Sequence, residues 1–190
     1  MLVNQKYTND QIWEAVTHEL KSALHVKNHP FRFMVMGSTD GIEVSQRYVV
    51  MRDIDDDLNV YAFTDNRTLK VEQFKKNPNC SLLFYHTEKR LQIRINGVVE
   101  LHQYAGLKDY YWKSVKGEAK KAYTSSNAPG EPIKEWEEAY QWDESLESRH
   151  FTVMKVIPAQ IEVLQLHKLE HLRIRFSKLN YEWVGQKLIP

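Results

Sequence analysis

The sequence has one cysteine, no long apolar run and almost no net charge, and each scarcity excludes a class of protein. Cys80 cannot form an internal disulfide, and its apolar surroundings, CSLLFY, predict a buried structural thiol. The 26 Lys and Arg residues oppose 25 Asp and Glu residues, so the chain lacks the cation excess of nucleic-acid-binding proteins. No apolar run approaches the roughly 20 residues that span a bilayer, and the start MLVNQKYTND does not have the layout of a signal peptide. We therefore expect a cytoplasmic protein with no nucleic-acid partner and no membrane partner.

Several well-known site motifs are also missing. No glycine-rich loop joins a strand to a helix, which excludes the Rossmann and P-loop phosphate sites. Ser45 and Ser81 lie in strand-like runs without the G-x-S-x-G elbow of a catalytic serine. The stretch from His167 to His171 spells the inverted zinc-protease pattern H-x-x-E-H, but that motif needs a helix. Because strand-like runs flank it, we predict a hairpin connection there and no metal site.

The residues that are present indicate one helix followed mostly by strands. Residues 8–24 place Ile12, Val16 and Leu20 at helical spacing, and Thr8 with Gln11 forms a capping-box pattern. Residues 91–101 alternate strictly between apolar and polar, with Gly97 marking a bulge or a close approach. Further runs rich in β-branched and aromatic residues predict strands: FRFMVMG, IEVSQRYVVMR, LNVYAFT, CSLLFYH, FTVMKVI, AQIEVLQL, HLRIRF and YEWVGQKLI.

Short helices interrupt these strands. Residues 64–76 and 104–123 have helical spacing, with Asn77-Pro78 ending the first of them. The acidic stretch 131–149 predicts a solvated helix held by Trp136, Tyr140 and Trp142, with a docking site as the alternative. Strands in series with few helices favour an antiparallel barrel or meander over a doubly wound sheet. The length of 190 residues predicts a single domain.

One constellation suggests phosphate binding. Arg47 and Arg52 stand at the two ends of an apolar strand, and the stretch TDNRTLK, residues 64–70, surrounds the start of the next helix with hydroxyls and cations. Arg forks, a Lys charge, hydroxyl donors and free helix N–H groups together suit a phosphate ester. An ordinary surface strand and a capped helix explain the same residues equally well.

The same motifs, in register, resemble the FMN-binding split barrels related to pyridoxamine 5'-phosphate oxidase. The matching stretches are RYVVMR at 47–52, YAFTD at 61–65, RTLK at 67–70, NP at 77–78, CSLLFY at 80–85 and QIRING at 92–97, followed by Arg175-Phe176 and Trp183 near the end. The resemblance implies an α+β fold, a six-stranded antiparallel split β-barrel. Its parts would be an N-terminal helix (1–29), the barrel core (30–101), a helical segment (102–150) and C-terminal strands (151–190).

The resemblance further implies a homodimer with FMN in a cleft at the subunit interface. The positions matching Arg47 and Lys70 would hold the flavin phosphate, with Thr64, Arg67 and Thr68 as added donors. Gln92 matches a glutamine that reaches FMN. Val49, Val50 and Met51 would line the flavin with backbone and side chain. Arg52, Phe63 and Arg175 complete the expected cofactor set, and Arg52 and Tyr110 are the expected substrate contacts.

The departures from the family pattern concern the substrate. Arg52 stands where the family has a substrate-contacting Lys, and Glu170-His171-Leu172-Arg173 replaces the family's C-terminal Arg-Leu-His element. In the oxidase, an Arg and a Ser on the helix after the barrel grip the vitamer phosphate, whereas Ser114 and Glu118 fall at those positions here. We therefore expect an FMN-dependent oxidoreductase that passes hydride between a small substrate and FMN, and expect pyridoxamine 5'-phosphate to be a poor substrate. A helix placed one turn further along would instead bring Lys113 or Lys116 to the phosphate and restore that activity. The alternatives are a nicotinamide-dependent flavin reductase and a non-catalytic flavin-binding or haem-binding module.

Overall fold

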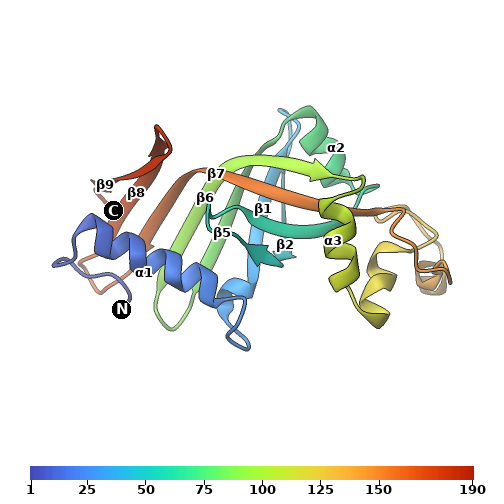
Figure 1. The fold of residues 1–190 in the computed structure, drawn as a ribbon, viewed down its shortest axis with the longest axis horizontal. Coiled ribbons are helices and arrows are strands. Elements are labelled where there is room, and N and C mark those ends of the chain that lie inside the picture. The colour runs from blue at the N-terminus through green and yellow to red at the C-terminus, as the bar shows by residue number, and fades with distance from the viewer.

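Nine antiparallel strands form one sheet in this computed structural model, which describes residues 1–190 (Figure 1). The strands are β1 (Phe33–Thr39), β2 (Val44–Val50), β3 (Asp53–Ile54), β4 (Val60–Asp65), β5 (Asn79–His86), β6 (Leu91–His102), β7 (Phe151–Gln165), β8 (Leu172–Leu179) and β9 (Glu182–Leu188). The sheet order is β2-β1-β5-β6-β7-β4-β3, and the β8–β9 hairpin pairs with β7. No pairing joins β2 to β3, so the sheet stays open. The predicted α+β split barrel is confirmed, with β3 and the β8–β9 hairpin in addition to six further strands.

The longest strand, β7, joins two strands that the sequence predicted separately. Its first half pairs with β4, while its second half pairs with β8. The register of β6 against β7 shifts between Asn96 and Gly97, opposite Pro158. A Cβ on Gly97 would lie 2.1 Å from the carbonyl oxygen of Ile157, so only glycine fits. Both predictions for Gly97, a bulge and a close approach, are confirmed.

The predicted N-terminal helix is α1 (Asn9–Ser22). The Thr8 side chain accepts from the N–H of Gln11, and the Gln11 side chain accepts from the N–H of Thr8, so the capping box is present. The helix lies along the barrel (Figure 1) and buries Val16 and Leu20 in one continuous core with the inward face of the sheet. Cys80 is buried in the same core, and burial raises the pKa of its thiol to about 12.

Two other predicted helices are shorter than expected. Helix α2 spans Leu69–Lys76, because Thr64 and Asp65 still belong to β4 and the Asp65 carboxylate accepts from the N–H of Arg67 to shape the turn. Residues 104–123 divide into α3 (Leu107–Ser114) and the 3₁₀ helix η2 (Gly117–Tyr123). Gly117, with φ +50°, lies at this division. A further 3₁₀ turn, η1 (Pro30–Arg32), precedes β1.

The prediction of an acidic helix over 131–149 was wrong. Only the 3₁₀ turn η3 (Trp136–Tyr140) forms there, and the rest is irregular. Trp136 is 76% exposed and Tyr140 60%, so these rings do not hold the segment against the core. Their spacing from Trp142 does not place the three rings on one helical face.

The predicted hairpin connection at His167–His171 is confirmed, since these residues form the turn between β7 and β8. The ring Nδ1 of His171 accepts from the backbone N–H of His167 at 3.2 Å, which closes the turn locally. No helix of the structure is both long and apolar enough to cross a membrane.

Candidate functional site

A cleft opens where the ends of β2 and β4 meet the start of α2. Its volume is about 290 Å³. It contains six of the predicted cofactor residues, and three unpredicted aromatic residues complete its wall; together they are Arg47, Val49, Val50, Arg52, Phe63 and Lys70, with Phe33, Tyr48 and Tyr123. The structure thus brings together residues from five elements, β1, β2, β4, α2 and η2, which lie up to 90 positions apart in the sequence, from Phe33 to Tyr123.

The cleft holds two half-buried cations, Arg47 and Lys70. The Arg47 guanidinium donates to the carbonyl oxygen of Met36 at 3.3 Å and to the Ser38 hydroxyl, while the Lys70 Nζ donates to Thr64 Oγ1 at 3.1 Å. Burial lowers the pKa of Arg47, and burial together with the charge of Arg47 lowers the pKa of Lys70. Neither cation forms an ion pair with a carboxylate. Two neighbouring cations without a carboxylate between them favour an added anion.

The Thr64 and Thr68 hydroxyls lie next to Lys70 at the start of α2, although neither threonine lines the cleft. Thr64 Oγ1 and Thr68 Oγ1 lie 3.3 Å apart, and Thr68 Oγ1 also donates to the carbonyl oxygen of Asp65 at 2.8 Å. The first N–H groups of a helix have no intrahelical acceptor, and the helix dipole attracts negative charge there. The geometry therefore combines cations, hydroxyls and a helix start, as a phosphate group requires.

Two residues of the expected cofactor set, Arg67 and Met51, direct their side chains to contacts within the protein. The Arg67 guanidinium pairs with the Asp65 carboxylate at 2.7 Å and donates to the carbonyl oxygen of Ser125 at 2.7 Å, so it holds the turn before α2. Met51 is fully buried in the core, which leaves only its backbone near the cleft. The expected side-chain contact from Met51 is therefore corrected.

Gln92 and Arg175 lie outside this cleft, on β6 and β8. Arg175 belongs to a cluster in which three arginines surround the buried Glu162 carboxylate. Arg94 and Arg173 donate to its Oε1, each at 2.8 Å, and Arg175 donates to its Oε2 at 3.2 Å. Burial opposes ionisation of Glu162, but the hydrogen bond from Arg173 and the charge of Arg94 outweigh it and lower the pKa of this carboxyl.

A larger cavity, of about 710 Å³, adjoins the cleft and shares Arg52, Phe63 and Tyr123 with it. It contains both predicted substrate residues, Arg52 and Tyr110. The Arg52 guanidinium stands over the Phe63 ring, 5.6 Å from its centroid. The two hollows therefore meet at one arginine and two aromatic rings.

The expectation that Glu118 faces this substrate cavity is wrong. Glu118 pairs with Lys121 at 2.7 Å and does not line the cavity, whereas Ser114, Lys113 and Lys116 do. The break in the helix at Gly117 changes the direction of the chain, so helical spacing from Tyr110 does not extend to Glu118.

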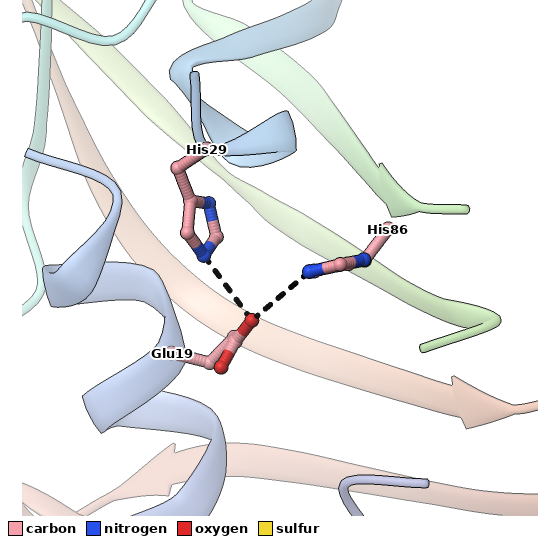
Figure 2. Close-up of side chains that lie close together, drawn as sticks. All are labelled: Glu19, His29 and His86. Carbon is pink, nitrogen blue, oxygen red and sulfur yellow. Dashed lines mark hydrogen bonds and ion pairs between the residues drawn. The ribbon is translucent and has the colours of Figure 1, made fainter. Parts of the chain in front are cut away.

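A buried cluster elsewhere joins α1 to the sheet (Figure 2). Glu19 Oε1 lies 3.2 Å from His29 Nε2 and 3.5 Å from His86 Nε2, and both Glu19 oxygens accept from Lys89 Nζ, at 2.6 and 2.7 Å. Each ring Nδ1 accepts a backbone N–H, from Phe31 and Lys89, so each Nε2 carries the hydrogen toward Glu19. A metal ion would bind to a ring-nitrogen lone pair, but both Nε2 atoms carry a hydrogen. The cluster is therefore held by hydrogen bonds and by the ion pair with Lys89. Burial, and next the charge of Lys89, lower the pKa of His86.

Comparison with known proteins places these features in a family. The family model described as "Pyridoxamine 5'-phosphate oxidase, FMN-binding domain" matches residues 11–103, which contain nearly all of the cleft. Over these residues the chain resembles the pyridoxamine 5'-phosphate oxidase-related family of FMN-binding split barrels. Curated relatives in the family include pyridoxine/pyridoxamine 5'-phosphate oxidases from Nostoc sp. and Synechocystis sp. The first is 27% identical over 172 residues, covering 85% of this chain and 79% of the relative. The second is 26% identical over 153 residues, covering 76% and 71%.

Two solved structures share the split-barrel fold of the family. A pyridoxamine 5'-phosphate oxidase-related, FMN-binding protein from Nostoc punctiforme has a TM-score of 0.77 at 18% identity, covering 98% of this chain and 100% of that one. PhzG from Burkholderia lata, in complex with tetrahydrophenazine-1-carboxylic acid, has a TM-score of 0.75 at 17% identity, covering 98% and 95%. At these identities the likeness shows the fold alone.

Sequence reasoning missed Tyr123 and Arg32, which line the two hollows. Tyr123 ends the short 3₁₀ helix η2, and Arg32 ends the 3₁₀ turn before β1, so no long periodic pattern marks either position. Gln73 was also missed as a support: its Oε1 accepts from Ser38 Oγ at 2.6 Å and holds α2 against β1 beside Arg47.

Proposed function

We propose that this protein is an FMN-dependent oxidoreductase, with hydride passing between a small substrate and the flavin. The observation that carries FMN binding is the pair of half-buried cations, Arg47 and Lys70, next to an apolar wall and without a carboxylate partner. The match of residues 11–103 to a family model that carries the FMN-binding name supports the same cofactor.

In this proposal the flavin phosphate lies between Arg47 and Lys70, with the Thr64 and Thr68 hydroxyls and the start of α2 as further donors. The flavin ring would pack against Val49, Val50 and Phe63. Arg67 acts indirectly, because its ion pair with Asp65 fixes the turn that carries these donors. Met51 contributes through its backbone alone.

We further propose a homodimer in which the second copy completes each cofactor site. A cleft of about 290 Å³ is at the lower end of the range for small-ligand sites, and FMN is a large ligand. Phe33 and Tyr48 on its wall are 57% and 76% exposed in the single chain, which suits an interface. Gln92 and Arg175 lie outside the cleft of their own chain, so their expected contacts with FMN require the cleft of the partner.

FMN supplies the hydride chemistry when it is bound. The protein then has three tasks: it binds the phosphate, it orients the ring, and it shields the ring from water. We assign no side chain as a general acid or base. The phenol of Tyr111, near the substrate cavity, donates to Asp53 at 2.7 Å, and burial together with that bond raises its pKa, so it stays protonated.

Reduction and reoxidation of the FMN-loaded protein test the activity. The flavin is photoreduced without oxygen, and oxygen or candidate acceptors are then added while its visible spectrum is recorded. We expect reoxidation by an acceptor and, in the reverse arm, bleaching of the oxidised flavin by a donor substrate. Rapid bleaching by NADH or NADPH would identify a flavin reductase instead. A flavin that exchanges electrons with none of them would contradict the oxidoreductase proposal and leave a binding module.

A further inference from the structure

The buried cluster of Glu19, His29, His86 and Lys89 joins separate parts of the chain (Figure 2). Glu19 belongs to α1, His29 ends the loop between α1 and η1, His86 is the last residue of β5, and Lys89 lies in the turn after it. The carboxylate and both rings are buried. None of the four lines the cofactor cleft or the larger cavity beside it. The cluster therefore takes no part in the proposed chemistry.

An added proton has only one place to bind on each ring. Because Nε2 already carries a hydrogen toward Glu19, the proton must bind to Nδ1. The Nδ1 of His29 accepts from the N–H of Phe31 at 3.1 Å, and the Nδ1 of His86 accepts from the N–H of Lys89 at 3.3 Å. Protonation of either ring therefore sets two hydrogens against each other and breaks a backbone hydrogen bond.

The charges around His86 oppose its protonation on balance. The ring faces the Glu19 carboxylate from α1, Lys89 and Glu88 from the turn, and the His29 ring from the loop. The carboxylates favour an imidazolium, but Lys89 donates to both oxygens of Glu19 and offsets its charge. Burial and next Lys89 dominate, so the pKa of His86 is lowered. When the cluster opens to water, the ring recovers its ordinary pKa of about 6.5.

His29 attaches the loop between α1 and η1 to the rest of the protein. Its Nε2 lies 3.2 Å from Glu19 Oε1 and 3.3 Å from the Ser22 hydroxyl, and its ring meets the His86 ring edge-on, with centroids 5.5 Å apart. The side chains from Leu24 to Asn28 form no hydrogen bond and no ion pair. If the contacts of His29 break, the loop loses its polar attachment to the helix and the sheet.

The same loop and the turn η1 form part of the wall of both hollows. Leu24, His25 and Arg32 line the cavity of about 710 Å³, and Phe33, directly after η1, lines the cofactor cleft. Phe31 lies between them, fully buried in the core, and donates the N–H that His29 accepts. A movement of this segment therefore changes both hollows while the sheet keeps its pairing.

We propose that the cluster of Glu19, His29, His86 and Lys89 is an acid-sensitive latch, in which proton uptake by the histidines releases residues 23–32 from α1 and β5. The inference goes beyond the proposed function and does not depend on FMN. The closed form is favoured above pH 6.5, and the open form gains as the pH falls, because only the open form binds a proton readily at His86. The ratio of open to closed forms then rises up to about tenfold for each pH unit below about 6.5.

Hydrogen exchange followed by mass spectrometry, at pH 7.5 and pH 5.5, measures this opening once each rate is divided by the intrinsic rate at that pH. We expect residues 23–32 and 87–90 to open at least about fivefold more at pH 5.5, while peptides from β6 and β7 keep their protection. A variant that combines His29→Asn with His86→Asn has no titrating ring but retains a side-chain acceptor at each position. Its opening should not depend on pH.

The matched control is His25→Asn, which replaces an exposed histidine in the same loop that belongs to no ion pair. This variant should keep the full pH dependence. Equal opening at the two pH values would overturn the inference, as would a pH dependence that survives in the double variant. An equal loss of protection in β6 and β7 would show global unfolding in place of a local release, and would overturn it too.

A measurement on the unchanged protein decides the matter if the double variant does not fold. Nuclear magnetic resonance of the histidine rings reports the tautomer and the titration of His86 in the folded chain. A ring with its hydrogen on Nε2 and a pKa below 6.5 supports the latch. A pKa of 6.5 or above contradicts it, because the closed form would then bind the proton as well as the open form does.

Discussion

Replacing Lys70 separates the role of the cation pair in FMN binding from any role in folding. The Lys70 ammonium makes one hydrogen bond, to Thr64, and its lowered pKa reflects burial and repulsion by Arg47. In the FMN-free protein this positive charge therefore lowers the free energy of unfolding. Lys70→Ala should leave the melting temperature of the FMN-free protein unchanged or raise it, while FMN binding should lose about 1.5 to 3 kcal/mol, the scale of a charge-assisted hydrogen bond. The corresponding increase in the dissociation constant is roughly 10- to 150-fold.

Arg47→Ala should weaken FMN binding by a similar factor, but it also removes bonds to Ser38 and to the carbonyl oxygen of Met36. Its stability is therefore expected to fall, unlike that of the Lys70 variant. The assay is quenching of flavin fluorescence on titration with protein, with riboflavin as the phosphate-free ligand and Lys76→Ala, at an exposed position on the same helix, as the control. If both variants bind FMN as tightly as the parent, or lose riboflavin and FMN equally, the phosphate assignment is wrong.

Four further outcomes follow from the structure. Light scattering on the FMN-loaded protein should give about twice the chain mass of 22.5 kDa, and dissociation of the dimer should release the flavin. A monomer that retains its flavin would refute the shared site. Pyridoxamine 5'-phosphate should bind weakly and therefore be a poor substrate, because Ser114 offers no charge where the family has arginine; efficient aerobic formation of pyridoxal 5'-phosphate would show that Lys113 or Lys116, which line the same cavity, binds the phosphate instead. Since burial and Lys89 lower the pKa of His86 below its unfolded value of 6.5, the unfolding midpoint should fall as the pH drops below about 6.5, and less so in His86→Asn. Gly97→Ala should reduce the free energy of unfolding by about 1 to 3 kcal/mol, measured in urea, because its Cβ would overlap the carbonyl of Ile157; an unchanged midpoint would contradict that contact.

Patterns within short stretches of sequence predicted the helices and strands whose formation depends on neighbouring residues. The Thr8 capping box placed the start of α1, and the alternation from Leu91 to Leu101 defined β6 with its bulge at Gly97. Arg47 and Lys70, from the two cationic stretches, line one cleft, because strand ends and helix starts concentrate donors where the chain turns.

Features that depend on long-range contacts were not predictable in this way. Arg67 has the composition of a phosphate ligand, but Asp65 and the carbonyl oxygen of Ser125 already bind it. Met51 directly follows Val49 and Val50 at the end of β2, yet its side chain lies in the core. Arg32 reaches the substrate cavity only because the turn η1 folds beside β4 and α3, an arrangement that no single window of sequence contains.

The account depends most directly on whether the protein recognises the phosphate of FMN. Equilibrium titration of the FMN-free protein with FMN and with riboflavin, followed by the flavin bands near roughly 370 and 450 nm, measures this in one experiment. We predict one FMN per chain and a riboflavin affinity at least about 100-fold weaker, since two cations face the phosphate. Equal affinities for the two flavins, or no binding of either, would contradict the central claim.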